Sequence, residues 1–88
     1  MNITYDKSFL KSLKKVNDAK TKASTLVFIE KAKQIHQLSE LSGIKKIQGF
    51  SHFYRFRIGK YRLGFKAEGD NLTLIILARR EDIYDAFP

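Results

Sequence analysis

The feature that most constrains the fold of this 88-residue chain is the segment FYRFRIGKYRLGFK, residues 53–66. Polar and apolar residues alternate with period 2 on both sides of Gly59 and Lys60, as they do in paired β-strands. A glycine in the first of two loop positions suits a type II′ turn. The segment therefore predicts a β-hairpin with strands over residues 52–58 and 61–67.

The two faces of this hairpin differ in chemistry. Counting outward from the turn, Ile58 pairs with Tyr61 and Arg57 pairs with Arg62. One face collects apolar and aromatic residues that we expect to form the core, namely Tyr54, Phe56, Ile58, Tyr61, Leu63 and Phe65. The opposite face, called the basic face below, collects Phe53, Arg55, Arg57, Arg62, Gly64 and Lys66.

Positive charge is concentrated around the basic face. Between residues 44 and 67 the chain has seven cations and no acid, the cations being Lys45, Lys46, Arg55, Arg57, Lys60, Arg62 and Lys66. Like charges opposite each other destabilise a strand pair, so folding alone does not favour the Arg57–Arg62 pair. Planar guanidinium groups suit phosphate. We therefore expect this face to bind an anion, rather than to be only a solvated polar face.

Several other residues near this face leave alternatives open. Gly64 creates a gap that a ligand or another part of the backbone can approach closely. Phe53 can stack on a nucleic-acid base or pack under the C-terminal helix. Arg79 and Arg80 end the last strand and Tyr84 follows them. If the chain folds back beside the hairpin, these three reach the basic face, and otherwise Tyr84 only anchors its helix.

Apolar periodicity and turn residues predict the remaining elements. Helical spacing favours a helix over residues 7–16, with Asp6 as N-cap, and a longer helix through residues 23–38 that ends near residue 41. Short strands are predicted at 3–5, 44–48 and 72–78, and a terminal helix at 81–87. The result is an α+β fold, with two N-terminal helices packed on one face of a small, mostly antiparallel sheet and a short C-terminal helix. We expect residues 1–88 to form a single domain.

The composition narrows the choice of partner and compartment. A formal net charge of +8 predicts a polyanionic partner such as nucleic acid, an anionic surface or an acidic protein. No apolar run is long enough to span a membrane or to form a signal peptide, so we expect no membrane partner. The absence of cysteine excludes disulfides and thiolate metal sites and fits a reducing cytosol. His36 and His52 lack partners at metal-ligand spacing, and we therefore expect neither a metal nor a cofactor.

Two segments carry a family resemblance: GFSHFYRFRIGKYRLGFK and, after an apolar strand, ARREDIYDAF. In this order they resemble the RelE/ParE superfamily of toxins from bacterial type II toxin–antitoxin modules, and most of all its RelE-like branch. The resemblance implies a ribosome-dependent mRNA endoribonuclease that cleaves by attack of a ribose 2′-OH on the adjacent phosphate. It also implies a cognate antitoxin, mRNA and the ribosome with its rRNA as partners, and a cytoplasmic location. The family pattern places catalytic function on Arg55, Arg57, Arg62, Arg80 and Tyr84. RNA binding would fall to Lys45, Lys46, Phe53, Lys66 and Arg79.

The sequence departs from that family at positions that bear on proton transfer. Some relatives carry lysines where this chain has Arg55 and Arg57, and a histidine where it has Arg79. An arginine cannot serve as a base, so the general base stays open between Tyr84, His52 and a ribosomal group. Two alternatives also stay open: a ParE-like protein that inhibits DNA gyrase without being a nuclease, and a catalytically decayed binding module whose only partner is its antitoxin.

Overall fold

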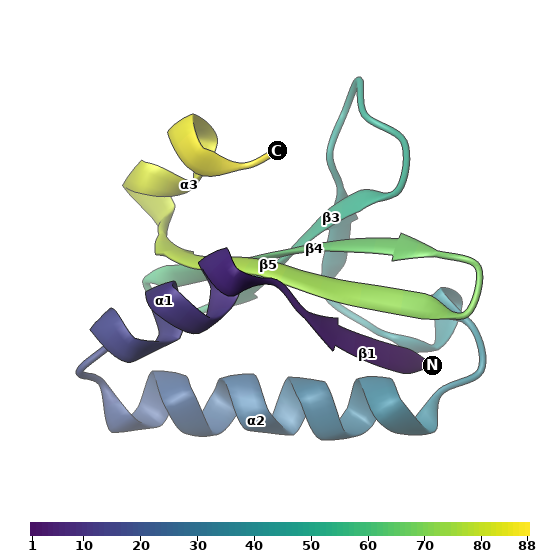
Figure 1. The fold of residues 1–88 in the computed structure, drawn as a ribbon, viewed down its shortest axis with the longest axis horizontal. Coiled ribbons are helices and arrows are strands. Elements are labelled where there is room, and N and C mark those ends of the chain that lie inside the picture. The colour runs from purple at the N-terminus through teal and green to yellow at the C-terminus, as the bar shows by residue number, and fades with distance from the viewer.

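A five-stranded sheet in the order β1-β5-β4-β3-β2 forms the centre of the structure, a computed structural model that describes all 88 residues (Figure 1). The strands are β1 (Asn2–Tyr5), β2 (Ile44–Lys46), β3 (Phe53–Ile58), β4 (Tyr61–Glu68) and β5 (Asn71–Arg79). β1 runs parallel to β5, and all other neighbours are antiparallel. The helices are α1 (Lys7–Lys15), α2 (Ala19–Gln34), a short 3-10 helix η1 (Leu38–Glu40) and α3 (Arg80–Ala86). The α+β class and the order of the elements are confirmed. No helix has the length and apolar character needed to cross a membrane.

The central hairpin has the predicted register. Ile58 pairs with Tyr61 and Arg57 with Arg62, and the pairing continues to Phe53 opposite Lys66. Gly59 has φ 57°, while Lys60 is not in the left-handed region, as the type II′ turn requires. The apolar and basic faces therefore lie on opposite sides of the sheet, as the alternation predicts.

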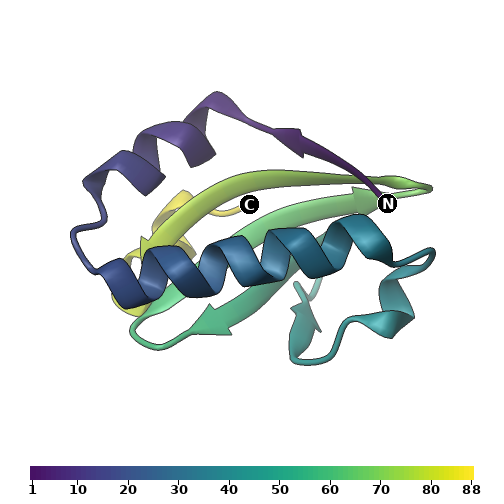
Figure 2. The same cartoon turned by 90° about the horizontal axis from the view of Figure 1, so that it is seen from below.

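The apolar face of the hairpin is covered by α2, which crosses it in Figure 2. The ring of Phe28 packs 4.7 Å from that of Phe56 and 5.5 Å from that of Phe65, measured between centroids. Tyr54 stacks on Phe65 at 5.7 Å, and Leu63 is fully buried. The prediction that these aromatic and aliphatic residues lie beneath a helix is confirmed. Their burial keeps the arginines of the same strands on the opposite side.

The first helix, α1, lies along the edge of β5 rather than over the middle of the sheet. β1 pairs with β5 only as far as Leu74, so beyond that residue β5 has no neighbouring strand on the side away from β4. Ser8 Oγ donates a hydrogen bond to the carbonyl of Ile75, and Ser12 Oγ accepts one from the N–H of Leu77 at 2.9 Å. Each such bond contributes about 1 kcal/mol. Two serines of a helix thus complete the hydrogen bonding of a strand edge.

The second helix ends earlier than predicted, at Gln34 rather than near residue 41. Its C-cap, Ile35, is extended, and the following turn is stabilised by the carboxylate of Glu40. Glu40 Oε2 accepts hydrogen bonds from the N–H groups of His36 at 2.8 Å and Gln37 at 3.0 Å. The hydrogen bonds from Gln37 and then from His36 lower the pKa of Glu40 below its usual 4.5. The apolar spacing that continues to Leu38 belongs to η1, not to the helix.

The buried stripe of α2 also differs from the one predicted. Leu26 and Val27, two large apolar residues of the predicted helix, are 59% and 68% exposed. Thr21 and Thr25 are buried in their place. The hydroxyl of Thr25 donates to the carbonyl of Thr21 at 2.8 Å, so burial leaves no polar group of Thr25 unpaired. Since Ile29 is buried, as the apolar spacing suggests, that spacing places only part of the buried stripe correctly.

Candidate functional site

The basic face lies on the side of the sheet opposite α2, and α3 folds back over it (Figure 1). α3 follows β5 directly. At the junction the N–H of Arg80 donates to the carbonyl of Lys60 in the hairpin turn at 2.9 Å. This bond ties the start of α3 to the hairpin. It brings Arg80 and Tyr84 to the arginines of β3 and β4.

A cavity of about 320 Å³ forms where these elements meet. It is lined by all five residues assigned to catalysis by the resemblance, together with two others: Arg55, Arg57, Arg62, Arg80, Tyr84, Lys45 and Gly43. The side chains come from β2, β3, β4 and α3, so the cluster depends on the whole fold rather than on one segment. Five cations around so small a volume favour a compact anion such as phosphate.

Tyr84 is both attached to this cluster and accessible. Arg55 Nη1 donates a hydrogen bond to the Tyr84 hydroxyl at 3.0 Å, and the guanidinium carbon lies 5.3 Å from the ring centroid. The Tyr84 side chain is nevertheless 66% exposed. The hydroxyl is thus oriented by Arg55, while much of the residue stays open to a ligand.

Arg62 is held against the hairpin turn. Its Nη1 donates to the carbonyl of Gly59 at 3.0 Å and to that of Tyr61 at 2.9 Å. Burial lowers the pKa of Arg62, and repulsion from the three neighbouring arginines lowers it further. An arginine still stays protonated at neutral pH. The repulsion is therefore an unfavourable energy that a bound anion would relieve.

No carboxylate neutralises the cluster. The structure contains two ion pairs, Lys33 with Glu30 at 3.4 Å and His52 with Glu68 at 3.8 Å, and neither includes a cation of the cavity. The cations of the basic face therefore have no protein counter-ion within 4 Å. This distribution of charge is the electrostatic basis for anion binding at this site.

The gap at Gly64 is filled by the chain itself. A Cβ atom on Gly64 would lie only 2.8 Å from the ring of Phe87, which follows α3 and is buried. The Phe53 ring meets the Phe87 ring edge-on at 5.6 Å. Of the two predicted roles for Phe53, packing under the C-terminal segment is the one observed, and no ligand can approach at Gly64. Sequence reasoning found the close approach but missed Phe87, the residue that makes it.

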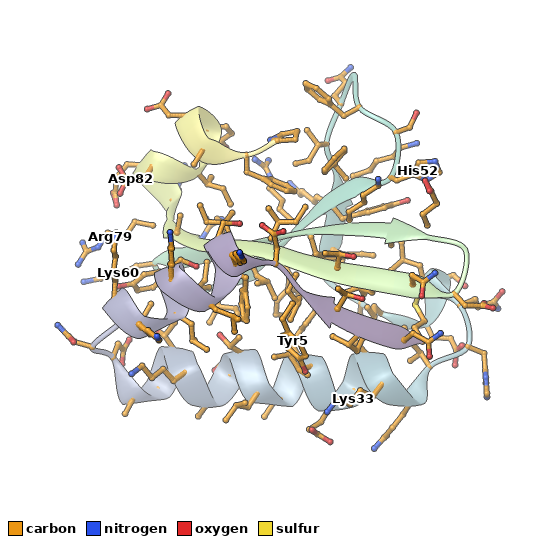
Figure 3. All side chains as sticks on the ribbon, viewed as in Figure 1. Tyr5, Lys33, His52, Lys60, Arg79 and Asp82 are labelled. Carbon is orange, nitrogen blue, oxygen red and sulfur yellow. The ribbon has the colours of Figure 1, made fainter.

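The other predicted residues lie outside the cavity. Lys66 has its ammonium group 5.9 Å from the Phe53 ring centroid, and Lys46 is exposed on β2. The Arg79 guanidinium lies 5.9 Å from the ring centroid of Tyr61. His52 lies at the opposite end of the sheet from Arg79, as Figure 3 shows. No group of three His, Cys, Asp or Glu side chains is arranged to hold a metal ion.

Comparison with known proteins identifies relatives over the full length. No protein-family model matches the chain. The chain is 37% identical to Toxin RelE3 of Methanocaldococcus jannaschii in an alignment 89 residues long, which covers 100% of both chains. It superposes on the toxin fold in the crystal structure of a RelB–RelE antitoxin–toxin complex from Methanococcus jannaschii with a TM-score of 0.83 and 33% identity, covering 97% of this chain and 99% of that one. The YoeB dimer from Staphylococcus aureus shares the fold with a TM-score of 0.71 at 15% identity, covering 91% and 97%.

Proposed function

Since the chain belongs to the RelE family of toxins from type II toxin–antitoxin modules, we propose that it is an mRNA interferase, a ribosome-dependent endoribonuclease. Its membership of this family confirms the resemblance found in the sequence. The observation that carries the proposal is the cavity in which four arginines and one tyrosine converge without a neutralising acid. Residues 1–88 would act as one toxin domain in the cytoplasm, with mRNA, the ribosome and a cognate antitoxin as partners.

The arrangement suits cleavage by an internal nucleophile. The ribose 2′-oxygen attacks the adjacent phosphorus and the bond to the 5′-oxygen breaks, which leaves a 2′,3′-cyclic phosphate and a 5′-hydroxyl. The five-coordinate phosphate of the transition state carries more negative charge on its oxygens than the diester does. Guanidinium groups arriving from β3, β4 and α3 can surround those oxygens. One preorganised donor of this kind accounts for about 10²–10³ in rate.

Donation of a proton to the leaving 5′-oxygen is the role that we propose for Tyr84. The arginines of the cavity cannot give up a proton, and His52 lies at the far end of the sheet beside Glu68. Tyr84 lies in the cavity, and its oxygen accepts a hydrogen bond from Arg55. The hydroxyl proton is not used in that bond, so it can be donated to the leaving 5′-oxygen. The 2′-hydroxyl proton would then pass to a ribosomal group or to solvent.

The gyrase alternative has less support. Two relatives that exceed 30% identity, one by sequence and one by structure, are RelE proteins. The role proposed for Tyr84 as a proton donor belongs to RNA cleavage and has no counterpart in gyrase inhibition. We therefore favour RNA on the ribosome as the target.

The test is cleavage of a reporter message by the purified protein on translating ribosomes. We expect cuts within the message that end in 2′,3′-cyclic phosphate, and none at a nucleotide whose 2′-hydroxyl is replaced by hydrogen. Arg55→Ala should abolish these cuts, whereas Lys33→Ala, which removes one charge on α2 far from the cavity, should not. An intact message together with inhibited plasmid supercoiling would establish the gyrase alternative instead.

A further inference from the structure

A second cavity adjoins the one described above. It has a volume of about 280 Å³ and is lined by Arg57, Gly59, Lys60, Arg62, Arg79, Arg80 and Glu81. Three arginines, Arg57, Arg62 and Arg80, line both cavities. Lys60 and Arg79 line only the second cavity. The two cavities are therefore adjacent, with a shared set of arginines between them.

The two cations that belong only to the second cavity are placed by ordered elements. Lys60 stands in the hairpin turn, and its carbonyl accepts the hydrogen bond from the N–H of Arg80. Arg79 ends β5, where its guanidinium lies 5.9 Å from the ring centroid of Tyr61. Figure 3 shows Lys60 and Arg79 at the same end of the sheet, close to the start of α3. The second cavity is thus part of the folded framework rather than of a free loop.

The charge of this cavity favours an anion. Five of its seven lining residues are cations, and one is an acid, Glu81. Glu81 forms no ion pair with any of them, since the two ion pairs of the structure lie elsewhere. The cations at this cavity thus outnumber the single acid and form no ion pair with it.

We propose that the second cavity binds the phosphate next to the scissile one, so that the protein grips two consecutive phosphates of single-stranded RNA. The proposal rests on the function proposed above. An RNA strand presents one phosphate per nucleotide, and a positively charged groove that follows the backbone is the usual means of binding it. Arg57, Arg62 and Arg80 stand between the two positions and contact either phosphate. Arg55 and Tyr84 serve only the scissile phosphate, and Lys60 and Arg79 only its neighbour.

The proposal is tested with 2′-O-methyl dinucleotides, which cannot be cleaved. One ligand, NpN, has only the internal phosphate, while pNpN and NpNp each carry a second phosphate on one side. Binding is followed by NMR chemical-shift titration at several salt concentrations. For the wild type we expect one of the two-phosphate ligands to bind about tenfold more tightly than NpN. Its affinity should also fall more steeply than that of NpN as salt is added, because one more charged group is bound. The ligand that gains affinity shows on which side of the scissile phosphate the second cavity lies.

The variants separate this proposal from the one on which it rests. Lys60→Ala and Arg79→Ala should each reduce the advantage of the two-phosphate ligand and leave NpN binding unchanged. Lys33→Ala is the charge-matched control and should preserve the advantage. If Lys60→Ala and Arg79→Ala behave like Lys33→Ala while Arg55→Ala weakens every ligand, the second phosphate site is refuted and the proposed function stands. If Arg55→Ala also has no effect, or if no ligand binds, the second phosphate site is refuted, and message cleavage on ribosomes decides the proposed function separately.

Discussion

Substitution of Gly64 by alanine tests how the terminal helix is held over the basic face. The added methyl group would lie 2.8 Å from two atoms of the Phe87 ring, closer than such atoms approach in folded proteins. Gly64 is not in a left-handed conformation, so the effect is steric and involves no backbone strain. Phe87 cannot simply move aside, because it is buried and its ring meets that of Phe53. An overpacked contact of this kind costs about 1–3 kcal/mol.

The loss of stability caused by Gly64→Ala has an upper limit. If the methyl group expels the Phe87 ring, the protein loses no more than the packing of that side chain. Removal of a buried phenylalanine typically costs about 3–5 kcal/mol. We therefore expect Gly64→Ala to lower the free energy of unfolding by about 1–3 kcal/mol, and Phe87→Ala to lower it by more, toward the upper value.

The assay is a double-mutant cycle measured by urea denaturation. In the Phe87→Ala background the ring is absent, so Gly64→Ala should cost nothing or stabilise by about 0.4–1 kcal/mol through the unfolded chain. The coupling energy between the two positions should then be about 1–4 kcal/mol. If the two effects are additive, the contact with Phe87 is not what requires glycine at position 64. Message cleavage should fall in both single variants, because α3 carries Arg80 and Tyr84.

Four further expectations follow from the same structure. Arg62→Ala should lower message cleavage by about 10²–10³. The free energy of unfolding of this variant should change by less than about 1 kcal/mol, because relief of like-charge repulsion offsets the loss of two hydrogen bonds to the turn. An unfolded variant would contradict this expectation. Tyr84→Phe should lower cleavage on ribosomes while His52→Gln leaves it near wild type, and the opposite result would move proton transfer to His52. The carboxylate of Glu40 has a lowered pKa, so it stabilises the fold above pH 4.5, and this stabilisation is lost as the pH falls through its folded pKa. The stability of Glu40→Gln, followed by thermal melting, should therefore lack this loss below pH 4.5, and the same pH dependence in variant and wild type would contradict the prediction. An acidic antitoxin segment should bind less tightly as salt is added, and a salt-independent affinity would indicate an apolar interface.

The hairpin and its charged face could be predicted from the sequence because they depend on local rules. The Gly59 turn sets the register, and period-2 alternation then assigns every residue to a face. No long-range information is needed to place Arg57 opposite Arg62. The prediction of an anion site on this surface used only that local geometry and the absence of acids.

The position of α2 could not be predicted in the same way, because two different stripes of the helix are able to face the core. Leu26 and Val27 look more suitable for burial than Thr21 and Thr25. The hydroxyl of Thr25 is satisfied within the helix, so the threonine stripe can be buried without an unpaired donor. The choice depends on how the helix fits the rings of the sheet, which the order of apolar residues does not report.

The sequence left two placements open for α3, beside the basic face or away from it, and only the family resemblance favoured the first. Gly64 indicated a close approach, but Phe87 is 23 positions away and its arrival depends on the direction of α3. That direction is set by the bond from the N–H of Arg80 to the carbonyl of Lys60. The bond joins two residues whose side chains carry no signal for it. Backbone contacts of this kind are formed by the assembled fold and leave little trace in the sequence.

The structure explains how an uncompensated arginine pair persists in a small domain. Arg57 and Arg62 alternate along their strands with Phe56 and Leu63, which pack under α2. A slip of one residue would direct the arginines into the core, at a cost of several kcal/mol for each buried charge. The apolar face therefore enforces the register that holds the arginines together, although they repel each other. Stability and ligand binding thus depend on opposite faces of the same two strands, and the repulsion between the arginines is relieved when an anion binds.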